Sequence, residues 1–206
     1  MKPNQEFNKL ASGKAIAKAV SSLERNGIRA IVLKNGDQAK KEVLNIIPAG
    51  AEVFTATSQT AEGISLAKEI NESGKYKSVR NKLMSMDRNT QSREMAKLGA
   101  SPEFVVGSVH AVTEDGQLLI ASASGSQLPG EAYSAEKVIF LVGTQKIVKN
   151  IQIGLKRIYE YSYPLEDARA QKAYGMRSGV NKILIINKEM THGRITVILI
   201  KENLGF

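Results

Sequence analysis

The 206-residue chain contains no cysteine. This absence excludes disulfide bonds, thiolate catalysis and cysteine-held metals or iron–sulfur clusters within the chain, and it favours a cytoplasmic location. The two histidines, His110 and His192, lack the spacing of metal ligands, so no metal site is predicted. No apolar run reaches the roughly 18 residues of a membrane span. Residues 1–6 lack the charged-then-apolar pattern of a signal peptide.

Fingerprints of common cofactor sites are also missing. The chain has no Gly-x-Gly-x-x-Gly, P-loop or Gly-x-Ser-x-Gly motif, and no nicotinamide, flavin or other cofactor is predicted. The net charge of +9 favours an anionic partner. Basic residues are scattered, without a long basic run or an aromatic-plus-basic ribonucleoprotein pattern. A small anionic metabolite is therefore expected as the partner, and a basic RNA-binding regulator is the less favoured alternative.

Apolar segments alternate with helical ones along the chain. This alternation predicts a single α/β domain over residues 1–206, with a mostly parallel sheet covered on both faces. The apolar segments expected as strands of this sheet are Ile28–Leu33, Ala51–Ala56, 104–106 and Val138–Val142.

The two ends of the chain carry separate expectations. Residues 1–27 are predicted to form a helical N-terminal extension, with one amphipathic helix over residues 5–26. Near the other end, the apolar segments 183–186 and 195–200 are joined by a short polar loop, and they predict an antiparallel pair of strands.

The segment 107–127 has the pattern of a β-hairpin, because two apolar runs flank Asp115-Gly116. Small polar residues and glycines crowd both of its ends, which indicates a segment that approaches a ligand. Glu114 is a candidate base or nucleophile and His110 a candidate proton shuttle. The alternatives are a solvated turn for Glu114 and a packed strand position for His110.

Two further loops follow predicted strands, where open α/β sheets bind ligands. Residues 57–62 could bind an anion through hydroxyls and helix N–H groups, or could only cap the helix. Gly143 lets the chain turn close to a ligand and Lys146 could pair with phosphate or carboxylate, the alternative being an ordinary turn. The predicted ligand-binding residues are Thr57, Ser58, Thr60, Gly107, Ser108, Thr113, Gly116, Ser124, Gly125, Gly143 and Lys146.

Residues 104–116 and 142–148 resemble motifs of the lactate-utilisation (LUD) domain family, and Thr57–Thr60 is similar to its Ser-x-Thr segment before a helix. The resemblance spans about residues 28–200. It implies a Rossmann-like sheet with added antiparallel strands, as in the sugar-phosphate isomerase and CoA-transferase superfamily. It also implies a link to oxidation of L-lactate to pyruvate beside iron–sulfur partner subunits, and it makes Glu114 the natural catalytic carboxylate.

The chain departs from some relatives in two places. Residues 173–182 contain none of the cysteines that those relatives carry, so any redox centre belongs to a partner. Ser126-Gln127 stands where some relatives have Asn-Arg.

Two functions stay open. One is a non-redox component or accessory of lactate utilisation that binds a small anion. The other is a free-standing enzyme acting on a CoA thioester, sugar phosphate or folate, with Glu114 as nucleophile or base. Either is compatible with a homo-oligomer.

Overall fold

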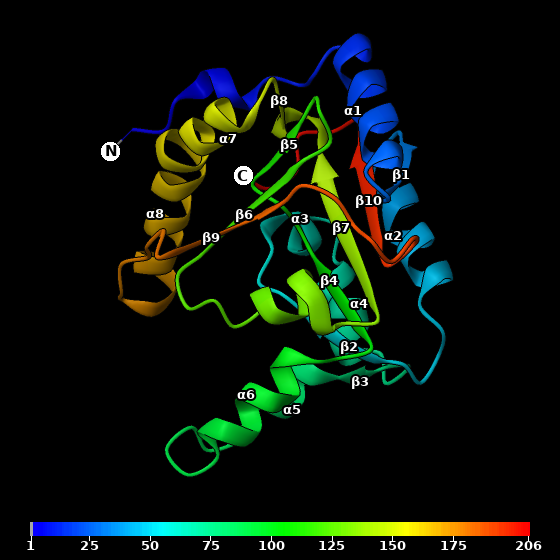
Figure 1. Cartoon of the computed structure of the whole chain (residues 1–206). Coiled ribbons are helices and arrows are strands. Elements are labelled where there is room, and N and C mark those ends of the chain that lie inside the picture. Colours follow the sequence, from blue (N-terminus) through cyan, green and yellow to red (C-terminus); the bar gives the residue numbers. More distant parts are fainter. Residues whose placement is uncertain (1) are drawn as a thin grey trace.

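A computed structural model describes residues 2–206 and contains two sheets (Figure 1). The larger sheet has the strand order β1-β10-β7-β4-β2-β3, and every neighbouring pair is parallel. Its strands are β1 (Arg29–Leu33), β2 (Glu52–Thr55), β3 (Lys77–Ser78), β4 (Phe104–Gly107), β7 (Lys137–Gly143) and β10 (Ile195–Ile200). The predicted α/β class with a mostly parallel sheet is confirmed.

The central strands are apolar along their whole length because both faces of the sheet are covered. All residues of β10 are buried, and in β7 only the first is exposed. Successive side chains of a strand point to opposite faces. Phe140 and Val142 accordingly pack in one core cluster, while Ile139 and Leu141 pack in the other.

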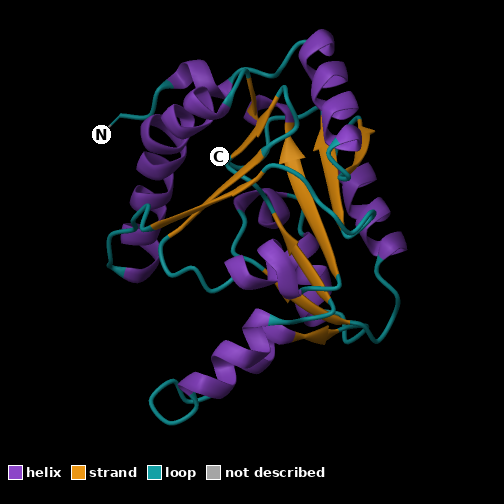
Figure 2. Ribbon diagram, in the orientation of Figure 1, coloured by secondary structure: helices purple, strands orange, loops and turns teal. Residues whose placement is uncertain are grey.

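Helices form layers on the two faces of this sheet (Figure 2). Helix α1 contributes Leu23 to the first core cluster, whereas α2 and α4 contribute Val43 and Ile70 to the second. The helices are α1 (Gly13–Arg25), α2 (Gly36–Ile46), α3 (Gln59–Gly63), α4 (Leu66–Glu72), α5 (Val79–Met84), α6 (Ser92–Ala100), α7 (Ile151–Arg157) and α8 (Tyr163–Tyr174). Short irregular helices occupy η1 (Gln5–Asn8), η2 (Gly130–Ser134), η3 (Thr144–Lys146) and η4 (Ile158–Ser162).

The first predicted helix is interrupted. The single helix expected over residues 5–26 is wrong, because η1 ends at Asn8 and α1 begins at Gly13. Ser12 caps α1 by accepting a hydrogen bond from the backbone N–H of Ala15, and a capping residue has an extended backbone that cannot continue a preceding helix.

The smaller sheet has the order β8-β5-β6-β9 and is covered by α7 and η4. Its strands are β5 (Ala111–Thr113), β6 (Leu118–Ser122), β8 (Ile147–Val148) and β9 (Lys182–Ile186). Strands β5 and β6 form the predicted antiparallel hairpin. The predicted pairing of β9 with β10 is wrong, because β9 pairs with β6 and β10 lies between β1 and β7. The fully apolar β10 suits a position buried on both faces, whereas β9 is only half-buried and lies at a sheet edge.

This arrangement sets the place of the site. Parallel strands end at one edge of a sheet, so the segments after β2, β4 and β7 meet there. The chain leaves β4 directly into β5, which brings the smaller sheet against this edge (Figure 1). Across residues 2–206, no helix has both the length and the apolar character needed to cross a bilayer.

Candidate functional site

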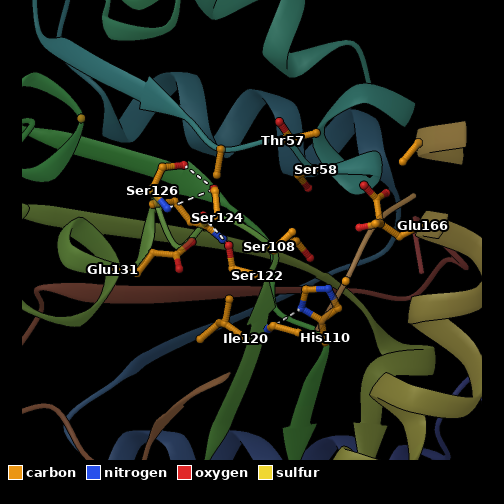
Figure 3. Close-up of a pocket in the computed structure, with 18 of the residues that line it drawn as sticks. Thr57, Ser58, Ser108, His110, Ile120, Ser122, Ser124, Ser126, Glu131 and Glu166 are labelled. Atoms are coloured by element: carbon orange, nitrogen blue, oxygen red, sulfur yellow. Dashed lines mark hydrogen bonds between the residues drawn. The ribbon is translucent and has the colours of Figure 1, made fainter. Parts of the chain in front are cut away.

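A cavity of about 940 Å³ lies beside the ends of β2 and β4 and against β6 (Figure 3). Hydroxyl groups dominate the part of its wall drawn there, and ionisable side chains lie among them. The labelled lining residues are Thr57, Ser58, Ser108, His110, Ile120, Ser122, Ser124, Ser126, Glu131 and Glu166. A cavity of this volume is large enough for a metabolite or part of a cofactor.

The structure brings part of the predicted site together. The predicted residues that line the cavity are Thr57, Ser58, Ser108, His110, Ser124 and Lys146. Thr60 stands behind them in contact with Lys146. The other predicted residues, which do not line the cavity, are Gly107, Thr113, Glu114, Gly116, Gly125 and Gly143.

Lys146 is the most deeply buried cation of the cavity wall, with 2% of its surface exposed. Its Nζ lies 3.0 Å from Ser108 Oγ and 3.1 Å from Thr60 Oγ1. Burial, with the nearby charge of Arg157 adding to it, lowers the pKa of Lys146 well below its ordinary value. The neutral amine of Lys146 is therefore favoured relative to an exposed lysine, and the side chain presents a hydrogen-bonding nitrogen to the cavity.

Arg157 supplies the positive charge behind this wall. Its buried guanidinium donates from Nη1 to the carbonyl oxygen of His110 at 2.6 Å and to Ser162 Oγ at 2.9 Å. Its Nε and Nη2 have no hydrogen-bond partner within residues 2–206. Burial lowers the pKa of Arg157 to about 10, so it remains charged at neutral pH.

His110 is held in one tautomer. Its Nδ1 accepts a hydrogen bond from the backbone N–H of Ala121 at 3.1 Å, which leaves the ring proton on Nε2. Burial, followed by the proximity of Lys146 and Arg157, lowers the pKa of His110 to about 3. The imidazole is thus neutral at physiological pH and offers an N–H donor, and its role as a proton shuttle stays a prediction.

Glu131 is a cavity residue that sequence reasoning missed. It lies in η2 with 1% of its surface exposed, and its Oε2 has no hydrogen-bond partner among residues 2–206. Burial raises the pKa of Glu131 to about 8, so the group is mostly a neutral carboxylic acid at pH 7. Its Oε1 lies beside Gly107, where an added Cβ would stand 3.4 Å from it, in ordinary van der Waals contact.

Arginines also contribute to the cavity wall. Arg80 donates to the carbonyl oxygen of Thr55 at 3.0 Å and to Thr57 Oγ1 at 3.2 Å. Arg169 is neutralised by a two-point contact with Glu166, at 2.7 Å for each bond. Arg80 has no such carboxylate partner within residues 2–206, so its charge is available to an anion.

Glu114 lies outside the cavity. Its carboxylate pairs with Lys18 of α1 at 3.0 Å, and its side chain is 27% exposed. Lys18 also lies 3.4 Å from Asp115, so the turn is tied to α1 by charge. The structure does not bring Glu114 to His110 or to the other lining residues, and its catalytic role stays a prediction.

The remaining predicted residues have visible structural roles. Thr113 donates from Oγ1 to Gln117 Oε1 at 2.8 Å across the turn. Gly116 adopts a φ of +81°, and a Cβ there would stand 2.6 Å from the backbone of Ser22 in α1. Gly125, at φ +84°, packs against Lys182, and Gly143 packs against Gln145. These glycines permit close packing.

The LUD domain family model matches residues 16–200. The chain belongs to the LUD domain family. This family is associated with lactate utilisation. No curated protein matches the chain in sequence.

One solved structure supports the same fold. A DUF162 family protein from Deinococcus radiodurans superposes with a TM-score of 0.57 at 10% identity, over 93% of this chain and 99% of that one. At this identity the likeness shows the fold alone. The β subunit of eIF2B from Chaetomium thermophilum gives a TM-score of 0.38 at 16% identity, over 56% of this chain and 43% of that one, and carries no argument.

The LUD domain thus surrounds its cavity with groups that can donate, accept or transfer protons. His110 and Glu131 are mostly uncharged at neutral pH, burial lowers the pKa of Lys146, and Arg80 supplies a positive charge. Within residues 2–206, no group of three or more acidic or histidine side chains is placed to hold a metal ion. The described lining offers a positive charge, hydroxyls and titratable groups, which are the groups that can contact an anion or exchange protons with a ligand.

Proposed function

We propose that this LUD-domain protein is a non-redox component of lactate utilisation that binds a small anionic metabolite in the cavity. The observation that carries the proposal is Arg80, a cation of the cavity wall without a carboxylate partner in residues 2–206. The hydroxyls of Thr57 and Ser58 lie on the same wall and add hydrogen-bonding groups. A guanidinium suits a carboxylate or phosphate because its donors bind both oxygens at once.

The shifted pKa values sharpen this proposal. Burial raises the pKa of Glu131 to about 8 and lowers that of Lys146, and both shifts favour the neutral form, so the attraction for an anion depends mainly on the arginines of the wall. Electron transfer would belong to iron–sulfur partner subunits, because the chain has no cysteine to hold a cluster. The protein would then bind the metabolite and present it within such an assembly.

Ligand binding tests the proposal directly. Purified protein is screened by thermal shift against lactate, pyruvate, acyl-CoAs, sugar phosphates and reduced folates. A ligand at about 100 times its Kd stabilises the folded state by roughly 2.7 kcal/mol, which a melting curve detects. A panel of anions without any effect would contradict the proposal.

The Arg80→Gln variant tests whether Arg80 binds the anion directly. Loss of a charge-assisted contact is expected to weaken binding about tenfold or more in a calorimetric titration, with the melting temperature little changed. The matched control is Arg93→Gln, which removes an exposed arginine of α6 that does not line the cavity. Equal affinities for the two variants would remove Arg80 from the site.

A further inference from the structure

We propose that Ser108 is a nucleophile for acyl transfer and that Lys146 is its general base. The inference rests on the proposed function in one respect, which is that the ligand binds in the same cavity. It goes further by assigning a reaction, cleavage of an ester or thioester. The chain lacks the Gly-x-Ser-x-Gly motif, so the assignment depends on the contacts of these side chains.

The pair has the spacing that proton transfer needs. Lys146 Nζ lies 3.0 Å from Ser108 Oγ, within hydrogen-bonding reach. Ser108 is half-buried and lines the cavity, so an acyl group in the cavity can reach its oxygen. Lys146 is enclosed behind it, which shields the amine from bulk water.

Thr60 orients the amine. Lys146 Nζ donates to Thr60 Oγ1 at 3.1 Å, and the Thr60 hydroxyl donates onward to the carbonyl oxygen of Leu204 at 3.2 Å. In the structure Lys146 Nζ also donates to Ser108 Oγ, and the Ser108 hydroxyl donates to the carbonyl oxygen of Val109 at 3.3 Å. The neutral amine has one lone pair, and it accepts the Ser108 proton once that hydroxyl turns from Val109 toward Nζ. A nucleophile, a base and a group that orients the base are therefore in mutual contact, as in serine–lysine catalytic pairs.

The surroundings favour the unprotonated form of the base. Burial and the positive charge of Arg157 hold the pKa of Lys146 well below its ordinary value. Arg157 is fixed in place by its bonds to the His110 carbonyl and to Ser162. No carboxylate forms an ion pair with Lys146 within residues 2–206, so nothing there restores the charge.

His110 provides a donor for the developing negative charge. It stands two residues after Ser108, lines the same cavity and carries its ring proton on Nε2. A neutral N–H donor stabilises the oxyanion of a tetrahedral intermediate without competing as a base.

The reaction proceeds in two balanced stages. Ser108 Oγ bonds to the acyl carbon while Lys146 Nζ takes the hydroxyl proton, and the alcohol or thiol departs with that proton. Water then attacks the Ser108 ester, Lys146 takes one of its protons and returns it to Ser108 Oγ, and a carboxylic acid is released. No oxidant, reductant or metal is needed. The substrate class is an ester or thioester with an anionic group within reach of Arg80.

Covalent labelling tests this assignment on the full chain. An uncharged alkyl fluorophosphonate reacts with activated serines, and intact-mass measurement followed by peptide mapping locates the label. We expect stoichiometric labelling of Ser108 in the wild type, and a rate about 100-fold or more slower in Lys146→Met. Ser108→Ala is expected to abolish the label. The matched control is Lys149→Met, an exposed lysine outside the cavity, which should label like the wild type.

Thr60→Val provides a second, milder test should Lys146→Met fail to fold. It keeps the side-chain volume and removes the hydroxyl that orients Lys146, so labelling should slow about tenfold. Its pH–rate profile should also shift, because the amine loses a hydrogen-bond partner, and a purely structural role would leave that profile unmoved.

The outcomes separate this inference from the proposed function. An unlabelled wild type, a label on another serine, or equal rates for the wild type and Lys146→Met would overturn the assignment. Anion binding measured without the probe would stand in each of those cases. Conversely, labelling of Ser108 in a protein that binds no anion of the panel would overturn the proposed function and leave the nucleophile in place.

Discussion

The cavity and the hairpin turn both hold ionisable side chains. Two of those in the cavity are buried without an ion-pair partner in the described part of the chain, whereas those at the turn form an ion pair. In the cavity, Lys146 and Glu131 are almost fully buried without an ion-pair partner among residues 2–206, and both shift toward their neutral forms. At the turn, Glu114 is partly exposed and paired with Lys18. Burying an ionisable group without a counter-charge lowers the stability of the fold, whereas an exposed ion pair changes that stability little in either direction. The costly groups are the ones that line the cavity.

Glu131→Gln gives the largest expected effect. The pKa of Glu131 rises from 4.5 to about 8 on folding, so the folded state keeps a proton that the unfolded chain releases. The contribution of Glu131 to stability should therefore fall as pH rises from 4.5 to 8, by on the order of 4 kcal/mol, and the difference in stability between the wild type and Glu131→Gln should change by that amount. The lowered pKa values of His110 and Lys146 act in the opposite direction in both proteins and cancel in this difference. Glutamine does not titrate, so the variant should lose the dependence that comes from Glu131, as measured by urea unfolding at a series of pH values.

A control variant shows whether the pH dependence comes from the burial of Glu131 or from any glutamate in this part of the chain. Glu136→Gln replaces an exposed glutamate shortly after Glu131 and should keep the wild-type pH dependence. If the two variants followed the same pH curve, Glu131 would be ionised in the folded protein, and the contrast between cavity and turn would weaken.

Gly116→Ala measures how the turn is held. The position requires a φ of +81°, and a Cβ would meet the backbone of α1 at Ser22. We expect a loss of about 3 kcal/mol in the free energy of unfolding. Gly50→Ala is the matched control, because Gly50 has a φ of +82° with open space around it, and it should lose only about 1 kcal/mol. Equal losses would mean that packing against α1 contributes nothing.

Local patterns were sufficient for much of the fold. The apolar runs of β7 and β10 identified buried parallel strands, and Asp115-Gly116 identified the hairpin. These patterns could not identify the pairing partner of β9, because an apolar run does not specify which of two sheets the strand joins. The break before α1 was also missed, although Ser12 carried a capping signal.

The site was predictable only in part for the same reason. Ser108 was selected because small polar residues crowd the ends of the hairpin, and Lys146 because its loop follows a strand, yet their contact joins positions far apart in the chain. Glu131 carried no signal, since its burial arises from η2 packing beside Gly107. Glu114 was identified from the family motif. Its partner Lys18 lies on α1, and the motif gives no information on where that helix packs.

Glu114→Gln gives the smallest expected effect and tests the comparison most directly. The catalytic role predicted from the motif requires the variant to lose function, whereas the position of the carboxylate outside the cavity predicts none. We expect unchanged anion affinity, unchanged labelling of Ser108 and a melting temperature close to that of the wild type, since an exposed ion pair contributes little. Calorimetry, intact-mass kinetics and a melting curve measure these on one preparation. A large loss of binding or labelling would show that the turn approaches the cavity when ligand binds, and would restore Glu114 to the mechanism.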